Sequence, residues 1–393
     1  MSSHSYYASK RISDIQSPII PIVADWIKET PGTISLGQGV VYYPPPKSIY
    51  ENSPIQNESL DYHLYSSVEG TVQLRKRICE KLENENDIDL SNNQKVIVTA
   101  GANMAFMNAI LAICESGDEI ILLKPFYFNH EMAIRMINCK VVVVETDNEF
   151  QPIIDNIASA ITDKTKAVVT ISPNNPSGAV YPRESLQAIN DLCKERKLYH
   201  ISDEAYEYFT YDAEHFSAAS LLDAYDHTIS LYSLSKAYGF ASWRIGYMVI
   251  PEHLFLSVKK IQDTILICPP RVCQDAAFAA LSEGKNYTLS HLHQIKAVRK
   301  ELYSSLQSIN KIGTTADSAG AFYYFMKLNT KMSGLELVEE LIKKHKIAVF
   351  PGEAFGMDNG YYIRIAYGAL DKNTAEIGIQ RLIDGLTTVI SKN

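Results

Sequence analysis

The feature that most constrains the fold is a regular alternation of short apolar runs and helix-length stretches between residues 95 and 251. The runs are rich in β-branched residues and almost continuously apolar, as strands buried on both faces of a sheet are. We expect strands at Lys95–Thr99, Glu119–Leu123, Lys140–Glu145, Ala167–Ile171, Leu198–Ser202, Thr228–Ser233 and Tyr247–Ile250. We expect helices between most of them, for example at Ala102–Cys114, Asn129–Asn138 and Arg183–Arg196. This pattern predicts an α/β fold with a mostly parallel seven-stranded sheet flanked by helices.

The chain changes character after about residue 284, where this alternation ends. Apolar residues then recur at helical spacing and predict one long amphipathic helix with all of them on its buried face. They are Leu289, Leu292, Ile295, Val298, Leu302 and Leu306. Beyond this helix we expect a strand at Ala321–Leu328, a helix at Leu335–His345, strands at Ile347–Phe350 and Tyr361–Tyr367, and a closing helix. This order is typical of a smaller α+β domain.

The change of sequence pattern near residue 284 predicts two domains, and we expect an N-terminal arm before them. The run Pro44-Pro45-Pro46 is expected to end the N-terminal segment. We expect the arm and part of the small domain over residues 1–47, a large ligand-binding domain over 48–284 and the small C-terminal domain over 285–393.

Composition and charge exclude several classes of protein. The 45 acidic and 37 basic residues give a net charge of −8, and no basic block is present, so nucleic-acid binding is not expected. No apolar run approaches the ~20 residues that a membrane helix needs. The six cysteines are scattered without a C-x-x-C pair, and neither they nor the histidines show metal-ligand spacing. The N-terminus has no apolar signal core, which favours a cytoplasmic location.

Polar and aromatic residues follow the predicted strands at the edge where parallel sheets bind ligands. The strands are followed in turn by Gly101, Ala102 and Asn103; by Tyr127 and His130; by Asn175; by Asp203 and Tyr206; and by Ser233, Ser235 and Lys236, with Arg244 eight residues further on.

These residue types suit one kind of cofactor. Gly101 and Ala102 open a helix, whose free N–H groups attract an anion, and two serines and Arg244 add donors and a positive charge for a phosphate. Tyr127 can stack on a flat ring, and Asp203 can hold a ring nitrogen protonated. Lys236 is an amine among mainly small and apolar residues, where its pKa falls and its nucleophilicity rises. Phosphate, flat ring, ring nitrogen and a carbonyl-reactive amine together describe pyridoxal 5'-phosphate.

Seven motifs in the same order carry a resemblance to a known family. They are Ser35–Val40, Tyr65–Gly70, Ser172–Gly178, Asp203–Tyr206, Ser233–Arg244, Pro351–Gly356 and Tyr362–Arg364. Along essentially its whole length the chain resembles the class I/II aminotransferases that depend on pyridoxal phosphate (PLP) and have fold type I.

The resemblance implies catalytic roles for Lys236, Asp203 and Tyr206. Lys236 matches the lysine that forms the internal aldimine and later moves a proton between the substrate Cα and the cofactor. Asp203 matches the carboxylate that pairs with the pyridinium nitrogen, and His130 lies where some members have a histidine that supports this aspartate. Tyr206 and Asn175 match the groups that hydrogen bond to the cofactor's 3'-oxygen.

The resemblance also implies cofactor and substrate contacts. Tyr127 matches the stacking aromatic residue, and Tyr65 matches a residue that reaches the phosphate of the neighbouring subunit, which implies a homodimer with shared sites. The phosphate cup would comprise Gly101, Ala102, Asn103, Ser233, Ser235 and Arg244. Arg364, with Asn175, matches the group that binds the substrate α-carboxylate in a bidentate fork. Gly37 matches the loop that closes over that carboxylate.

The chain departs from the family pattern at two positions. Ser242 stands where a glycine is usual before Trp-Arg, and we expect the turn to tolerate this small residue. Asn103 stands where some aspartate-specific members have a lysine, which argues against an acidic substrate side chain. Three segments, Thr99–Phe106, Tyr206–Asp212 and Lys260–Asp263, most resemble a subgroup that uses aromatic amino acids or methionine as amino donors. The resemblance therefore favours an aromatic or other apolar donor.

Alternative functions remain open from the sequence. Aspartate or a broad range of donors is the second choice of substrate. A C–S lyase, decarboxylase or ring-forming synthase on the same fold would share the cofactor motifs. A PLP-sensing transcription regulator is disfavoured because Gly37 and Tyr65 already belong to the fold, which leaves no room for a preceding DNA-binding domain.

Overall fold

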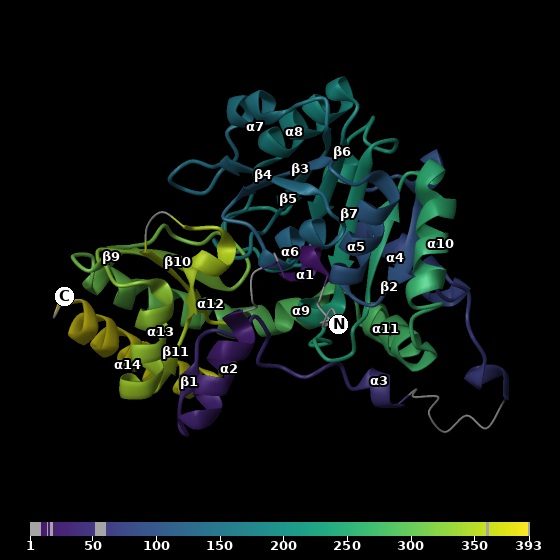
Figure 1. Ribbon diagram of the computed structural model, residues 1–393. Helices are drawn as coiled ribbons and strands as arrows, with labels where there is room; N and C mark the ends of the chain where they lie inside the picture. Colours follow the sequence, from purple (N-terminus) through teal and green to yellow (C-terminus); the bar gives the residue numbers. More distant parts are fainter. Residues whose placement is uncertain (1–8, 14, 16–18, 52–59, 359–360, 392–393) are drawn as a thin grey trace, which may run out of the picture.

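The computed structural model in Figure 1 describes residues 9–13, 15, 19–51, 60–358 and 361–391. A large sheet with its helices occupies the upper right of Figure 1, and the C-terminal helices and a smaller sheet occupy the lower left. The helix α2 (Ile19–Glu29) of the N-terminal segment lies with the C-terminal elements.

The central sheet has seven strands in the order β2-β8-β7-β6-β5-β3-β4. They are β2 (Lys95–Thr99), β3 (Glu119–Lys124), β4 (Lys140–Glu145), β5 (Thr165–Ile171), β6 (Tyr199–Asp203), β7 (Thr228–Ser233) and β8 (Gly246–Ile250). All are parallel except β8, which runs antiparallel to both of its neighbours. The predicted mostly parallel sheet is confirmed, and each predicted strand end lies within two residues of the observed one.

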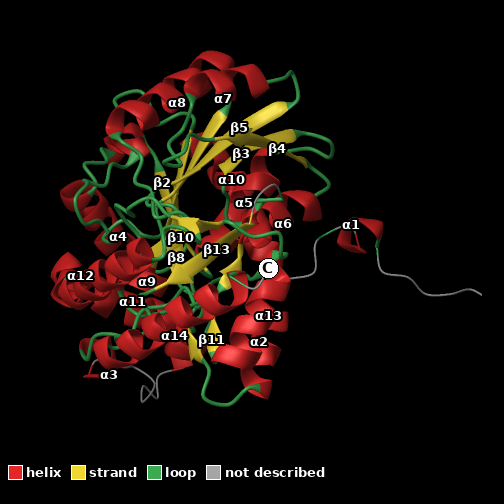
Figure 2. Cartoon of the chain, turned by 90° about the vertical axis from the view of Figure 1, so that its left-hand side faces the viewer, coloured by secondary structure: helices red, strands yellow, loops and turns green. Residues whose placement is uncertain are grey.

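Helices cover both faces of this sheet, as Figure 2 shows. They are α4 (Val72–Glu85), α5 (Ala102–Ile113), α6 (Phe128–Met136), α7 (Ile154–Ala160), α8 (Arg183–Arg196), α9 (Leu234–Ala237), α10 (Phe255–Ile265) and α11 (Arg271–Glu283). Alternate residues of β2 pack on opposite sides: Ile97 joins α5 and α10, whereas Val96 and Val98 join α4 and α11. The continuous apolar runs in the sequence arise from this two-sided burial.

A four-stranded antiparallel sheet, ordered β12-β13-β10-β9, forms the centre of the C-terminal part. Its strands are β9 (Gly313–Thr314), β10 (Tyr323–Leu328), β12 (Phe350–Pro351) and β13 (Tyr361–Ala366). The helices are α12 (Lys285–Ser308), α13 (Gly334–His345) and α14 (Lys372–Ile390). One hydrophobic core joins these elements to Val23, Leu36 and Tyr43 of the N-terminal segment. This shared core supports the predicted division of the chain, which stays a prediction.

Two details of the C-terminal prediction are wrong. Leu289 is 42% exposed. Thr288 takes its place on the buried face, because the helical repeat extended back from Leu292 falls on residue 288. The run Ile347–Phe350 is not one strand: β11 (Ile347–Ala348) pairs with β1 (Ile34–Ser35), whereas β12 pairs with β13. The chain changes partner at Val349, so two short strands replace the expected one.

Two further short helices lie in the N-terminal segment and just after it, α1 (Lys10–Ser13) and α3 (Ser48–Glu51). Among the described residues, no helix combines the length and the apolar character needed to cross a bilayer.

Candidate active site

A cavity of about 430 Å³ opens at the carboxyl edge of the central sheet. It collects most of the residues that the sequence singled out: Ala102, Asn103, Tyr127, Asn175, Asp203, Tyr206, Ser233, Ser235, Lys236, Arg244 and Arg364. Asn175, Asp203 and Lys236 come together because the parallel strands β5, β6 and β7 end at this edge, whereas Arg364 reaches it from β13 of the smaller sheet.

Lys236 lies in α9, the short helix that follows β7, and its Nζ donates to the carbonyl of Gly39 at 2.5 Å. The pKa of this amine is lowered to about 8, chiefly by loss of hydration and also by the positive charges of Arg364 and Arg244, whereas Asp203 opposes them. A lysine with this pKa has a sizeable neutral fraction near neutral pH, as a nucleophilic amine requires.

Asp203 is the last residue of β6 and is buried. Its Oδ2 lies 3.2 Å from Nε2 of His130, which is itself buried. The ring of Phe106 stacks on the His130 ring at 4.0 Å between centroids, and Tyr127 meets it edge-on at 5.4 Å. The imidazole is therefore fixed on several sides, and it holds the Asp203 carboxylate toward the cavity.

The start of α5 and the side chains of Ser235 and Arg244 provide the donors for an anion. Arg244 Nη1 lies 3.3 Å from Oγ of Ser235, and α5 begins directly after Gly101. Gly101 has φ +79°, a backbone conformation that favours glycine, and a Cβ there would lie 2.5 Å from Arg244 Nη2 and would displace that guanidinium. The turn containing Ser242 is present, and Ser242 is not among the residues with positive φ, so a serine fits there.

Arg364 is 4% exposed and lies in β13 on the cavity side. Its Nη1 donates to Asn175 Oδ1 at 2.8 Å and its Nη2 to the carbonyl of Gly37 at 2.6 Å. Its Nε, although buried, has no hydrogen-bond partner within the described ranges. A buried guanidinium with donor capacity left over suits a carboxylate ligand.

Four of the singled-out residues lie outside the cavity wall, and one of them is His130, which contacts the wall residue Asp203. Gly37 and Gly101 each contact a wall residue, as described above. Tyr65 is 80% exposed and does not line this cavity.

The sequence reasoning missed other wall residues, among them Ile20, Gly39 and Tyr323, whereas Phe128 was an alternative to Tyr127 as the stacking ring. Gly39 lies in the quoted Ser35–Val40 motif and Tyr323 in the predicted aromatic strand, so both had a local signal. Their position in the wall depends on contacts between distant parts of the chain.

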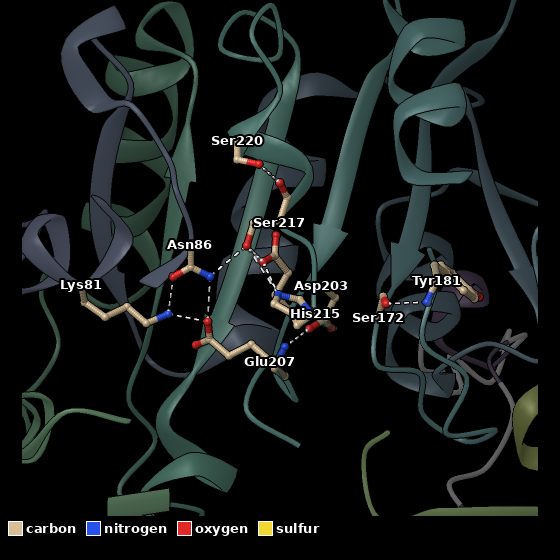
Figure 3. Close-up of polar contacts among 11 residues, drawn as sticks. Lys81, Asn86, Ser172, Tyr181, Asp203, Glu207, His215, Ser217 and Ser220 are labelled. Carbon is tan, nitrogen blue, oxygen red and sulfur yellow. Dashed lines mark hydrogen bonds and ion pairs between the residues drawn. The ribbon is translucent and has the colours of Figure 1, made fainter. Parts of the chain in front are cut away.

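A buried polar cluster lies beside Asp203, as Figure 3 shows. Its members are Lys81, Asn86, Glu204, Glu207, His215 and Ser217. Glu204 accepts from Ser217 at 2.5 Å, and Glu207 forms an ion pair with Lys81. Glu204 directly follows Asp203, and Glu207 directly follows Tyr206. The contacts of these two carboxylates therefore fix the segment that carries Asp203 and Tyr206.

The residues present fit the cofactor inferred from the sequence. A lysine with a lowered pKa, a buried carboxylate supported by His130, and an anion cup of Gly101, Ser235 and Arg244 surround one cavity. Bound PLP would supply an aldehyde and an electron-withdrawing ring to that cavity. Fold and cavity together define a PLP-dependent enzyme of fold type I.

Comparison with known proteins gives the family. Residues 31–382 match the model of "Aminotransferase class I and II", so the chain belongs to this family of PLP-dependent enzymes. It is 30% identical to aromatic aminotransferase ISS1 of Arabidopsis thaliana, over 97% of both chains. It is 33% identical to an aspartate aminotransferase of Pyrococcus abyssi, over 85% of this chain and 87% of that one. A single mutant of Thermus thermophilus aspartate aminotransferase superposes with a TM-score of 0.89 and 27% identity, over 97% of this chain and 100% of that one.

The lowered pKa of Lys236 predicts a pH dependence of cofactor capture. Only the neutral amine attacks the aldehyde, and its pKa is about 8 rather than 10.5. The rate constant for PLP binding to the cofactor-free protein should rise with pH below 8 and level off above it. Stopped-flow absorbance at ~420 nm measures this rate, with free N-acetyl-lysine as the control of ordinary pKa. A rate that still rises tenfold per pH unit up to pH 10 would contradict the lowered pKa.

Proposed function

We propose that this aminotransferase moves the amino group of an aromatic or other apolar L-amino acid to a 2-oxo acid by a ping-pong mechanism. The observation that carries the donor preference is the set of charges in the cavity wall. The cationic residues of that wall are Lys236, Arg244 and Arg364, and the proposal gives each a role toward the cofactor or the α-carboxylate. Among the wall residues none of the cations is then free to bind an acidic side chain.

The wall also has apolar surface for such a donor. Ile20 from α2 and Phe128 from the start of α6 line the cavity. The relative named an aromatic aminotransferase supports this preference. The relative named an aspartate aminotransferase keeps aspartate, or a broad range of donors, as the second candidate.

The roles follow from the chemistry of each group. Arg364, with Asn175, orients the substrate by its α-carboxylate, and Asp203 keeps the ring nitrogen protonated. Lys236 Nζ takes the proton from the substrate Cα and returns it at the cofactor carbon, for which an amine with a pKa of about 8 is suited. Tyr206, whose pKa burial raises well above the usual value, stays a neutral hydrogen-bond donor to the ring oxygen. Release of the first 2-oxo acid before the second binds gives ping-pong kinetics.

A panel of half-reactions tests the proposal. Protein in the PLP form is mixed with single L-amino acids while the bands near ~420 nm and ~330 nm are followed. We expect Phe, Tyr, Trp or Met to convert the ~420 nm band to the ~330 nm band at least about tenfold faster than Asp. Faster conversion by Asp would favour the aspartate alternative. Release of ammonia or CO2 without the ~330 nm band would indicate a lyase or decarboxylase instead.

We also infer a homodimer with shared active sites. Large apolar side chains are exposed close together in the sequence: Tyr50, Leu60, Leu64, Tyr65 and Val72, with exposures of 61%, 73%, 56%, 80% and 70%. Large apolar side chains left exposed on one chain are expected to be covered by a partner when they form one patch. Light scattering should give about twice the 44.0 kDa of one chain, and a mass of one chain at micromolar concentration would contradict the dimer.

A cytoplasmic location is proposed from the sequence and from the cysteines, which are all free thiols, as is usual in reducing compartments. Recovery of the protein in a membrane or secreted fraction of the source cells would contradict this location.

A further inference from the structure

Tyr323 is a wall residue to which the proposed function gives no role. It is the first residue of β10 and is completely buried. Its hydroxyl oxygen lies 2.6 Å from that of Tyr206, and the Arg364 guanidinium carbon lies 4.6 Å from its ring centroid. Tyr323 therefore contacts both the residue proposed for the cofactor's ring oxygen and the residue proposed for the substrate carboxylate.

Four side chains contact one another in a closed circuit, in which each touches the next: Arg364, Asn175, Tyr206 and Tyr323. Arg364 donates to Asn175 Oδ1 at 2.8 Å, and Asn175 Nδ2 lies 3.5 Å from the Tyr206 oxygen. The hydroxyls of Tyr206 and Tyr323 meet, and the ring of Tyr323 returns to Arg364. A change at any one member therefore reaches the others.

The contact between Tyr206 and Tyr323 allows either hydroxyl to donate, and the other partners of the two phenols indicate which of them does. A phenol has one proton to donate and two lone pairs that accept. Asn175 Nδ2 is a donor, so the Tyr206 oxygen accepts from it. Within the described ranges, Tyr206 is the hydrogen-bond partner of the Tyr323 hydroxyl. When Tyr323 donates to Tyr206, both lone pairs of Tyr206 are used and its own proton is free for an acceptor in the cavity.

The N-terminal segment limits the movement of Tyr323. A Cβ at Gly39 would overlap the Tyr323 hydroxyl, so the backbone of residue 39 lies directly against it. The carbonyl of Gly39 also accepts from Lys236 Nζ. The hydroxyl of Tyr323 thus has little freedom to turn away from Tyr206.

We propose that Tyr323 is a positioning residue: its hydroxyl donates to Tyr206 and so directs the Tyr206 proton to the cofactor's ring oxygen, while its ring holds Arg364 in place for the substrate carboxylate. The inference rests on the roles that the proposed function gives to Tyr206 and Arg364. A donor that itself accepts a hydrogen bond is a stronger donor. Tyr323 therefore acts on the cofactor through Tyr206 without touching it.

The Tyr323→Phe variant isolates the hydroxyl, because phenylalanine keeps the ring against Arg364. A weaker donor leaves more negative charge on the ring oxygen, and the nitrogen that joins Lys236 to the cofactor becomes more basic. We expect the pKa of the ~420 nm chromophore to rise by about half a unit in this variant and by about a unit or more in Tyr206→Phe. The double variant should shift no further than Tyr206→Phe alone. Equilibrium binding of PLP to the cofactor-free protein is expected to weaken about two- to fivefold in Tyr323→Phe.

The neighbouring strand residue provides a matched control. Tyr324 is also completely buried, but its hydroxyl donates to Asp317 at 3.1 Å. Tyr324→Phe removes the same atom from the same strand and should leave the chromophore pKa unchanged.

A second substitution isolates the ring. Tyr323→Leu removes the aromatic face under Arg364. Loss of this cation–π contact is expected to weaken the binding of a carboxylate ligand by about threefold or more. The dissociation constant of 3-phenylpropionate, an unreactive carboxylate, is read from the perturbation of the ~420 nm band. It should rise in Tyr323→Leu and stay within about twofold of the wild-type value in Tyr323→Phe.

The outcomes separate this inference from the proposed function. A normal wild-type half-reaction, with a shift in Tyr206→Phe and none in Tyr323→Phe, would overturn the inference alone. Shifts that add in the double variant would also overturn it, because Tyr323 would then act independently of Tyr206. No shift in Tyr206→Phe would remove the assigned role of Tyr206 and the inference with it. A wild-type protein that binds PLP but transaminates no amino acid would instead contradict the proposed function.

Discussion

Replacing Lys236 with alanine is expected to lower the rate of the half-reaction by at least about a thousandfold, because one amine both holds the cofactor and moves the proton. The variant also loses the covalent link between residue 236 and the cofactor. Borohydride reduction of the wild-type protein should add one pyridoxyl group to the peptide that contains Lys236, and reduction of the variant should add none.

The structure offers a matched control for this change. Lys194 is an exposed lysine paired with Asp223 on the surface, and Lys194→Ala should leave both the rate and the labelling unchanged. A Lys236→Ala protein that keeps the reducible ~420 nm band would show that another amine binds the cofactor.

Replacing Arg364 with alanine is expected to raise the KM for amino acid substrates by about a hundredfold, with a smaller effect on kcat. The fork formed by Arg364 would make two charge-assisted hydrogen bonds to a carboxylate, each worth about 1.5 kcal/mol or more. Arg364→Lys keeps the charge but loses the fork geometry, so its KM should lie between those of the wild type and Arg364→Ala.

A substrate without a carboxylate distinguishes the loss of carboxylate binding from a general disruption of the active site by the substitution. The conversion of 2-phenylethylamine uses no carboxylate contact, so wild type and Arg364→Ala should process it at similar, slow rates. An unchanged KM for phenylalanine, or an equal loss with both compounds, would contradict the role of Arg364.

The periodic pattern of the sequence sufficed for the large sheet. Each strand run is apolar on successive residues because helices cover both faces, and that local property is readable without tertiary structure. The same reasoning placed Asp203 and Lys236 at one edge, since parallel strands end together. It was less successful at the margins of elements, where Leu289 and the run Ile347–Phe350 were assigned wrongly because the helical phase and the choice of strand partner depend on long-range packing.

The resemblance to the family named most of the cavity wall, yet it gave no account of how those side chains are held. The contact of Tyr206 with Tyr323 joins residues 117 positions apart, and that of Arg364 with Gly37 joins residues 327 positions apart. The buried cluster beside Asp203 likewise links Lys81 to Glu207 across 126 positions.

The sequence by itself determined the α/β class, the order of the strands along the chain and the residues that meet at the carboxyl edge of the sheet. These follow from periodicity and from the geometry of parallel strands, which are local rules. Only the tertiary structure decided that Gly39 and Tyr323 enter the cavity wall and how far its neighbours lower the pKa of Lys236. Burial and charge at one atom are sums over neighbours from every part of the chain, and no local pattern contains that sum.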